Sequence, residues 1–388
     1  MRPYKNLFLA LIFLFVACEE ASNNSVAEEE ILETEEAAVL DQYLNLPDQA
    51  YNYADPDLPA FFNQNDNEEQ DNTPNNNPVT DWGATLGRVL FYDVNLSANN
   101  TISCASCHVQ EDGFSDPNQF SEGFEGGLTG RNSMGLSSAA FYENGNFFWD
   151  ERAGTLEEQV LLPIQDAIEM GLTLEEMVVK VSAQEYYPIL FTRTFGDDEI
   201  TSNRISLALS QFVRSMVSYQ SKYDVGRAQV NDSEDDFPNF TDLENLGKRV
   251  FFSNNTDCSN CHTSDHFVGD EARNNGLDAV LTDLGLGEIT GRNQDNGKFK
   301  TNSLKNIELT APYMHDGRFA TLEEVVEHYD SGIQNSPNLD NRLSNRNGTP
   351  VRMNLSNQEK AALVAFMKTL TDTELITDEK FSNPFRDN

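Results

Sequence analysis

Apolar residues recur at helical spacing along much of the chain, and few segments show the alternation that is typical of a strand. The helical pattern is clearest over residues 156–182 and 205–219. Apolar residues three or four positions apart line one face of a helix, where they pack against a core. The pattern therefore predicts a mainly α fold in which most of these residues serve the core.

Two short amphipathic turns have nearly the same sequence, LGRVLF at residues 86–91 and LGKRVF at residues 246–251. Each lies shortly before a cysteine-containing motif. A pattern that occurs twice predicts two similar structural units. We expect an N-terminal domain at residues 81–223 and a C-terminal domain at residues 224–388.

The first eighteen residues have the pattern of an export signal. Arg2 and Lys5 precede the apolar run Leu7–Ala17, and Cys18 follows it. A basic start and an apolar stretch of this length are typical of a secretory signal, and the stretch is shorter than the roughly 20 residues that span a bilayer. The residues before Cys18 resemble a bacterial lipobox, in which the cysteine is lipidated. The alternative is an ordinary signal with an incidental cysteine, and both predict a periplasmic protein.

Residues 19–80 differ in composition from the rest of the chain. Residues 28–36 are rich in Glu, and residues 63–78 are mostly Asn, Asp, Gln and Pro. Such a segment has little apolar surface to offset the entropy lost on ordering. We expect a flexible acidic tether, with enough aromatic residues between Tyr43 and Phe62 to dock in part.

The charge of the chain limits its partners. Its 388 residues include 26 Lys and Arg against 64 Asp and Glu, which gives a net charge of −38. Nucleic-acid binding needs a basic face, so we expect none. Anionic lipid headgroups are disfavoured for the same reason, which leaves the N-terminal lipid anchor as the membrane contact. A neutral or basic protein partner is favoured.

Four of the five cysteines lie in two copies of the pattern C-x-x-C-H, the attachment signature of c-type haem. The two thiols bond to the haem, and the next residue supplies the proximal imidazole to the iron. The motif residues are Cys104, Cys107 and His108 in the first copy, and Cys258, Cys261 and His262 in the second. Zinc is an alternative at the second copy, where His266 completes four ligands, but no such residue follows the first. We predict two covalently bound haem c groups in cytochrome c-like domains.

Further short sequences accompany these motifs in a specific order. They are Gly130-Arg131-Asn132, Phe148–Ala153, Leu156–Gln159, Pro163 and Glu169-Met170 between the motifs, and Thr310–Gly317 and Thr321–Glu324 after the second. In this order the chain resembles the bacterial dihaem cytochrome c peroxidase family, which includes the MauG-type enzymes. The resemblance covers residues 86 to about 371.

The resemblance implies a peroxide-reacting haem with His108 as its proximal ligand. Glu169 matches the distal carboxylate that moves a proton between the two peroxide oxygens, a task suited to a positioned acid–base group. Gln159 and Pro163 match other distal positions, and Trp149 matches a tryptophan between the haems. If this alignment is shifted, Glu157 is the alternative carboxylate, although an exposed helix face is its plainer interpretation.

Two departures concern the iron ligands. Residues 109–146 contain no histidine, and Phe124 stands where many members have a distal one. The first iron is therefore expected to be open to peroxide without prior reduction. At the second haem, Tyr329 stands where many members have an axial Met, and a phenolate would lower the potential. His328 and Met314 are the rival ligands.

The resemblance also implies supporting groups between the haems. Asn132 and the carbonyls of Thr310 and Pro312 match a calcium site, and oxygen donors of this kind suit Ca²⁺. His315 matches a buried histidine near the second haem that is expected to form hydrogen bonds rather than bind iron.

We therefore predict a tethered dihaem peroxidase that reduces hydrogen peroxide with electrons from a small periplasmic cytochrome c or cupredoxin. One alternative is a MauG-type oxidase that acts on a protein or organic substrate through a high-valent two-haem state. Such enzymes use a surface tryptophan near the second haem, and this chain has only Trp82 and Trp149. Another alternative is a non-catalytic dihaem electron carrier. The oligomeric state is left open, a homodimer being one option.

Overall fold

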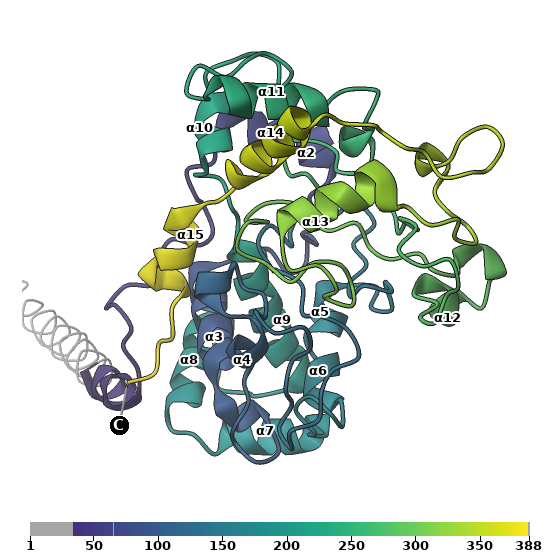
Figure 1. The fold of residues 1–388 in the computed structure, drawn as a ribbon. Helices are drawn as coiled ribbons and strands as arrows, with labels where there is room; N and C mark the ends of the chain where they lie inside the picture. The colour runs from purple at the N-terminus through teal and green to yellow at the C-terminus, as the bar shows by residue number, and fades with distance from the viewer. Residues whose placement is uncertain (1–33, 65, 387–388) are drawn as a thin grey trace, which may run out of the picture.

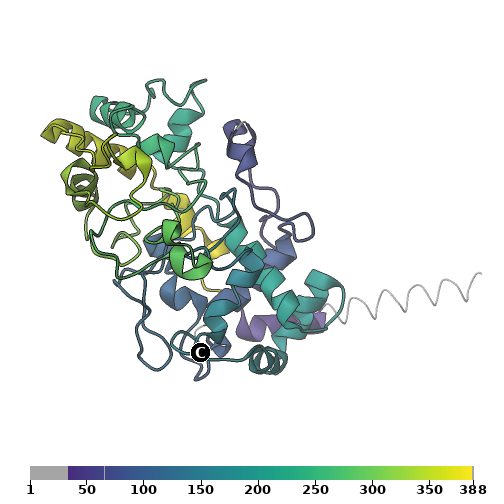
Figure 2. The same cartoon turned by 90° about the vertical axis from the view of Figure 1, so that its right-hand side faces the viewer.

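The computed structural model describes residues 34–64 and 66–386, which form two helical lobes (Figures 1 and 2). Residues 34–43 are helical. The other α-helices are α2 (Asp66–Glu69), α3 (Asp81–Tyr92), α4 (Cys104–Cys107), α5 (Leu156–Gln159), α6 (Leu162–Gln165), α7 (Leu174–Ser182), α8 (Tyr186–Phe195), α9 (Ser202–Ser215), α10 (Lys222–Arg227), α11 (Asp242–Phe251), α12 (Leu286–Thr290), α13 (Leu322–Glu327), α14 (Asn357–Lys368) and α15 (Thr373–Thr377). The described residues contain isolated β-bridges but no strand. The prediction of a mainly α fold is confirmed.

The first lobe is built on the pair α3 and α9, which α5, α7 and α8 surround (Figure 1). Thr80 and Thr201 cap these two helices by accepting hydrogen bonds from backbone N–H groups of the first turn. Gly87 lies where the helices cross, and a Cβ there would be 2.0 Å from the carbonyl oxygen of Ala208. The missing side chain is therefore what allows the two backbones to touch.

The second lobe repeats this arrangement with α11 and α14. Capping boxes that begin at Thr241 and Ser356 start the two helices. A Cβ on Gly247 would be 1.9 Å from the carbonyl oxygen of Ala362. The internal repeat in the sequence thus corresponds to one helix crossing that is built twice.

Each lobe has its own apolar core. The C-terminal segment leaves the second lobe after α14 and returns to the first, where Leu375 and Phe381 are buried (Figure 1). The ring centroid of Phe381 lies 6.2 Å from that of Phe212 on α9 and 6.0 Å from that of Tyr53. The end of the chain therefore closes the core of the lobe that precedes it.

The segment predicted as a flexible tether is packed where the structure describes it. Leu44, Tyr53 and Phe62 are each no more than 3% exposed, and they contact the lobes. These three residues lie in the stretch for which partial docking was predicted. Asn67 and Gln70 lie beyond it and are also buried, so the polar part of the segment is packed more fully than predicted. The predicted signal and Cys18 lie outside the described residues. Among the helices that are described, none is both long enough and apolar enough to cross a membrane.

The helical pattern over residues 156–182 does not form one helix. It is divided into α5, α6 and α7, and the side chain of Asp166 accepts hydrogen bonds from the backbone N–H groups of Ile168 (2.8 Å) and Glu169 (3.2 Å). This local turn replaces the helical hydrogen bonds after α6. Over residues 205–219, by contrast, α9 covers most of the predicted helix.

Candidate functional site

The first C-x-x-C-H motif occupies α4 and the residue that ends it. Cys104 and Cys107 are free thiols, and His108 follows them on the wall of a cavity of about 540 Å³. The ring atom Nδ1 of His108 lies 2.9 Å from the carbonyl oxygen of Phe114. This contact fixes the ring and leaves Nε2 as the atom for a metal. Burial lowers the pKa of His108, which keeps the imidazole neutral.

The second motif begins in the 3₁₀-helix η4 (Cys258–Asn260). Cys258, Cys261 and His262 all line a second cavity of about 240 Å³. Nδ1 of His262 lies 3.2 Å from the carbonyl oxygen of Phe267, and burial lowers the pKa of His262 to about 4. Each motif thus offers two free thiols and a neutral imidazole held through Nδ1, which fits a covalently bound haem.

The zinc interpretation of the second motif is wrong. His266, the proposed fourth ligand, is fully buried, and its ring stacks on that of Phe141 with 3.6 Å between centroids. In the described ranges no three His, Cys, Asp or Glu side chains come together as a metal site.

The carboxylate predicted for the distal side lies in the cavity of His108. Glu169 lines this cavity, and so do Gln159 at the end of α5 and Pro163 in α6. Two backbone hydrogen bonds hold Glu169 in its turn: its N–H donates to Asp166 at 3.2 Å, and its carbonyl accepts from Phe124 N at 3.0 Å. Burial raises the pKa of Glu169, the nearby Asp166 carboxylate raises it further, and Arg152 lowers it.

The alternative carboxylate, Glu157, does not line this cavity and is not part of an exposed helix face. It forms an ion pair with Arg214 at 2.5 Å and accepts a hydrogen bond from Asn77 at 2.7 Å. The Arg214 contact lowers the pKa of Glu157 against the effect of burial. Phe124 stands at the place of the missing distal histidine. Its ring packs on Gly171 and does not line the cavity. Among the described lining residues, His108 is the one histidine.

Trp149 lies between the two cavities and lines both of them. Its indole N–H donates to the carbonyl of Asn132 at 2.8 Å, and its own carbonyl accepts from Lys300 N at 2.8 Å. Its ring stands edge-on to that of His315, with 6.4 Å between centroids. Residues of both lobes therefore hold the indole in place.

Two of the three candidate axial ligands line the second cavity, and the third does not. Tyr329 and Met314 face the same amide: Asn275 Nδ2 lies 3.3 Å from the Tyr329 hydroxyl and 3.4 Å from the Met314 sulfur. Burial raises the pKa of Tyr329 to about 12. His328 instead lies with Nε2 3.1 Å from the carbonyl oxygen of Asn275, and it is absent from the lining.

The remaining predicted residues surround the second cavity. His315 stacks on Phe299 with 3.7 Å between ring centroids, and burial lowers its pKa. Asn132, Thr310 and Pro312, the residues of the proposed calcium site, all line the cavity. The side chain of Asn132 donates to the carbonyl of Asn118 at 3.0 Å.

Two polar groups of the site, Arg131 and Asn275, have no role that was predicted from the sequence. Arg131 forms paired hydrogen bonds of 2.8 Å with Asp283 and so joins the lobes at the rim of the first cavity. Asn275 approaches both candidate ligands of the second iron. Arg131 lies in the Gly130-Arg131-Asn132 motif that the sequence did single out, whereas no sequence pattern marks Asn275.

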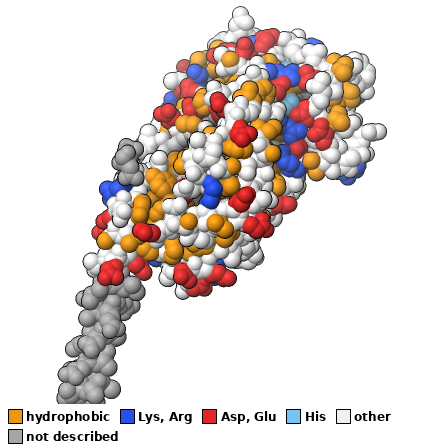
Figure 3. All heavy atoms as spheres, turned by 90° about the horizontal axis from the view of Figure 1, so that it is seen from below, with side chains coloured by type: hydrophobic (Ala, Val, Ile, Leu, Met, Phe, Trp, Pro, Cys, Tyr) orange, Lys and Arg blue, Asp and Glu red, His pale blue; other side chains and the backbone are white. Residues whose placement is uncertain are grey.

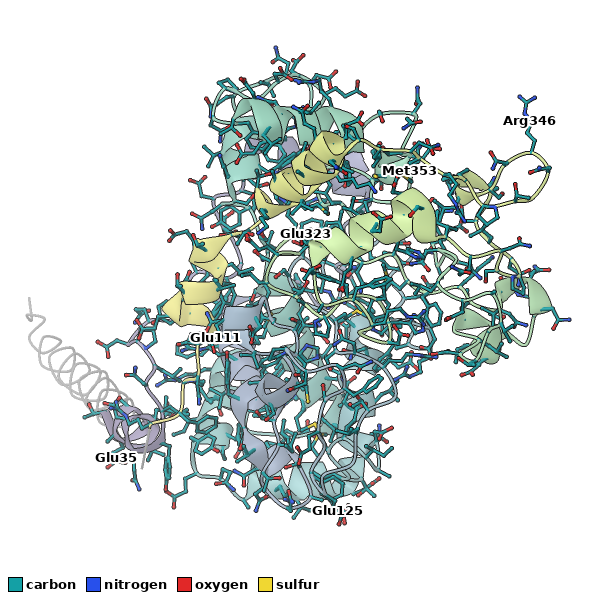
Figure 4. All side chains as sticks on the ribbon, viewed as in Figure 1. Glu35, Glu111, Glu125, Glu323, Arg346 and Met353 are labelled. Atoms are coloured by element: carbon teal, nitrogen blue, oxygen red, sulfur yellow. The ribbon has the colours of Figure 1, made fainter. Side chains whose placement is uncertain are left out.

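Farther from the cavity, Arg346 points away from the second lobe at the tip of its loop (Figure 4).

Two motifs of this geometry define a dihaem c-type protein, and comparisons with known proteins agree. A family model for the di-haem cytochrome c peroxidases matches residues 82–231. The methylamine utilization protein MauG of Methylophilus methylotrophus is 34% identical over 303 aligned residues, covering 76% of this chain and 84% of that protein. Cytochrome c551 peroxidase of Nitrosomonas europaea is 32% identical over 292 residues, covering 74% and 79%.

A solved structure, that of a MauG-like protein associated with microbial copper homeostasis, matches with a TM-score of 0.73 and 35% identity, covering 85% of this chain and 99% of that chain. The chain belongs to the family of di-haem cytochrome c peroxidases and MauG proteins. It is an oxidoreductase with two c-type haems.

Proposed function

We propose that the protein reduces hydrogen peroxide at the haem bound by Cys104, Cys107 and His108. The observation that carries this proposal is the cavity that Glu169 shares with His108. No second histidine is present among its described lining residues, which leaves room on the distal side for a small oxidant. The reaction consumes one peroxide, two electrons and two protons, and it yields two water molecules.

The residues of this cavity supply the proton transfers. The haem, when bound, accepts and delivers the electrons. The Glu169 carboxylate takes the proton from one peroxide oxygen and returns it to the other, so that the O–O bond breaks with water as leaving group. Its raised pKa suits this work, because a group with a pKa nearer to the working pH both accepts and donates readily. The Gln159 amide orients the peroxide.

Trp149, which lines both cavities, would carry electrons from the second haem to the first when both are bound. A small periplasmic cytochrome c or cupredoxin is the proposed donor. Figure 3 shows acidic side chains spread over the face in view, with some basic ones gathered in one part of it. We propose that the excess of negative charge steers a basic donor, so that its association slows as salt is added.

The decisive experiment is a titration of the ferric protein with hydrogen peroxide, followed by optical and EPR spectra. We expect a high-spin haem that disappears on addition of stoichiometric peroxide, without prior reduction. Glu169→Gln should keep both haems and slow this reaction about 10²- to 10⁴-fold, the usual contribution of a general acid–base group. The matched control is Glu175→Gln, an exposed residue on α7. An unchanged rate in Glu169→Gln would exclude the proposed role.

A MauG-type oxidation of a protein or organic substrate is the second candidate. It is favoured by the position of Tyr329 on the wall of the second cavity and by the MauG relatives. Addition of a reduced cytochrome after peroxide separates the two: the peroxidase returns to the ferric state with stoichiometric oxidation of the cytochrome. Two low-spin haems that ignore peroxide, also after half-reduction, would instead indicate an electron carrier.

We also propose that the protein is exported and held at a membrane by a lipid on Cys18, as its signal pattern indicates. Mass spectrometry of the N-terminal peptide tests this, and an unmodified N-terminus would contradict it. A calcium site formed by Asn132 and the carbonyls of Thr310 and Pro312 is likewise proposed, because all three residues line the second cavity. Elemental analysis of the purified protein measures its occupancy.

A further inference from the structure

A short segment before α3 joins the two lobes. We call it the strap and define it as η1 (Ala60–Asn63) together with residues 67–70. Phe62 is 2% exposed, and its ring lies 6.0 Å from that of Phe141 in the first lobe and 4.8 Å from that of His266 in the second, measured between centroids. Phe61 is buried beside it, under the guanidinium of Arg227 at 5.1 Å. The apolar half of the strap is therefore anchored in both lobes.

The polar half of the strap binds the residues that directly follow His262. The Asn67 amide donates to the Asp265 carboxylate at 3.0 Å and accepts from Asp265 N at 2.8 Å. The Gln70 amide donates to the Thr263 hydroxyl at 2.9 Å and accepts from the Ser264 hydroxyl at 2.5 Å. Both amides are buried, with Asn67 5% and Gln70 4% exposed. Four hydrogen bonds thus fix three consecutive residues.

These residues form the loop that holds the imidazole of His262. Thr263 N donates to the carbonyl of Val268 at 3.0 Å and closes the loop, while the Phe267 carbonyl faces His262 Nδ1 at 3.2 Å. Ser264 and Phe267 have φ angles of +57° and +53°. Non-glycine residues in this region cost about 1 kcal/mol or more each and persist only where their surroundings hold them. The strap supplies such surroundings.

We propose that Asn67 and Gln70 are positioning residues for the proximal ligand of the second haem. By fixing the loop, they set the direction of the His262 ring and the strength of the contact between its Nδ1 and the Phe267 carbonyl. A proximal histidine that donates a stronger hydrogen bond is a more basic ligand and lowers the reduction potential of its iron. The inference needs the two haems of the family but not the peroxide reaction proposed above.

The test is a spectroelectrochemical titration of the full-length protein, with EPR of each haem and no peroxide present. Gln70→Ala removes two of the four hydrogen bonds and leaves the apolar anchors in place, so the variant should fold and bind both haems. We expect the midpoint potential of the second haem to rise, with a shift of at least about threefold in its reduction equilibrium, and its low-spin EPR signal to broaden. Adding Asn67→Ala should increase the shift.

Three further variants make the result specific. Gln70→Glu keeps the acceptor for Ser264 and loses the donor to Thr263, so its effect should be smaller than that of Gln70→Ala. Glu68→Ala changes an exposed residue of the same helical turn and should leave both haems unchanged. Gln110→Ala is the equivalent substitution in the loop after the first haem motif, because the Gln110 amide donates hydrogen bonds to the carbonyls of Leu375 and Asp378. It should alter the first haem and leave the second unchanged.

An unchanged second-haem potential and signal in haem-loaded Gln70→Ala would overturn the proposal, and so would an equal shift of both haems. Because no peroxide is used, a protein that proves inert to peroxide could still pass this test. Conversely, an active peroxidase with an unaltered second haem in Gln70→Ala would refute only the role of the strap.

Discussion

The loops that follow the two haem motifs share one device and differ in what holds them. In both, Nδ1 of the proximal histidine faces the carbonyl of a phenylalanine in the left-handed region, Phe114 at φ +60° and Phe267 at φ +53°. The first loop is tied by Gln110 to the carbonyls of Leu375 and Asp378, at 3.3 and 3.0 Å, near the C-terminus. The strap near the N-terminus binds the second.

Each end of the chain therefore supports one of the haem loops, and the two are not supported equally. The first loop contains Gly113 at φ +66°, which adopts this conformation at no steric cost. The second loop has Ser264 in the left-handed region, and the strap contributes four hydrogen bonds to hold it. A loop without glycine needs more external support, which explains why a segment of such polar composition is packed.

The cavities differ as clearly as the loops. The first is lined by the Glu169 carboxylate and, among its described residues, by no histidine other than His108, whereas the second is lined by Tyr329 and Met314. This contrast supports the proposed division between a haem that reacts with peroxide and a haem that transfers electrons.

Of the changes considered, Tyr329→Phe is expected to have the largest effect on the difference between the two haems, through the spin state and the reduction potential of the second haem. If Tyr329 is the axial ligand, its loss should convert most of the second haem from low spin to high spin and raise its potential, because a phenolate stabilises the oxidised iron. The first haem should not change. EPR of the ferric protein measures both. Met314→Leu is the matched control on the same wall, and a loss of the low-spin signal in that variant alone would assign the ligand to Met314.

A smaller effect, on stability, is expected from adding a side-chain atom at each of the two helix crossings. Gly87→Ala and Gly247→Ala each place a Cβ about 2 Å from the carbonyl of the facing helix, and they should lower the free energy of unfolding of their own lobe by about 1–3 kcal/mol. Urea unfolding with the Soret signal of each haem follows the lobes separately. Gly130→Ala, where nothing lies within 4 Å of the added atom, should change stability by less than about 0.5 kcal/mol. Equal loss in both lobes from one variant would contradict independent cores.

The sequence was sufficient for the features that local patterns determine. Helical periodicity predicted the α fold, and the repeat containing Gly87 and Gly247 predicted one unit built twice. The order of short motifs selected Glu169 and Gln159, which line one cavity, although Gln159 ends α5 and Glu169 lies in the turn that Asp166 forms.

Two of the features that were missed depend on partners far along the chain, and a third depends on a local side-chain contact. A polar composition predicts disorder because it offers little apolar area, yet it says nothing of amides such as Asn67, whose partner Asp265 lies 198 positions away. Glu157 looked like a surface residue because Arg214, 57 positions later, carries no signal that the two would meet. The break after α6 arises from the Asp166 side chain, which hydropathy does not register.

The smallest expected effect concerns pH and the residue beside the strap. His266 is fully buried between Phe62 and Phe141, neither ring nitrogen has a hydrogen-bond partner, and burial holds its pKa well below the usual 6.5. Below pH 6.5 the unfolded chain binds a proton at this position that the folded chain does not bind. The free energy of unfolding therefore falls as the pH is lowered, by about 1 kcal/mol between pH 7 and 5.5 from this group.

His266→Phe preserves the ring stacking and removes the titrating group. Urea unfolding of this variant and of the parent protein at several pH values isolates the contribution, because all carboxylates are common to both. The variant should lose about 1 kcal/mol less over this range. If the free energies of unfolding of the variant and the parent protein changed equally with pH, His266 would be protonated in the folded protein or accessible to water. The loop that contains it would then be less tightly packed than the loop after the first motif. A difference that appears only below pH 6.5 would place the buried, neutral histidine where the strap, the first lobe and the second lobe meet.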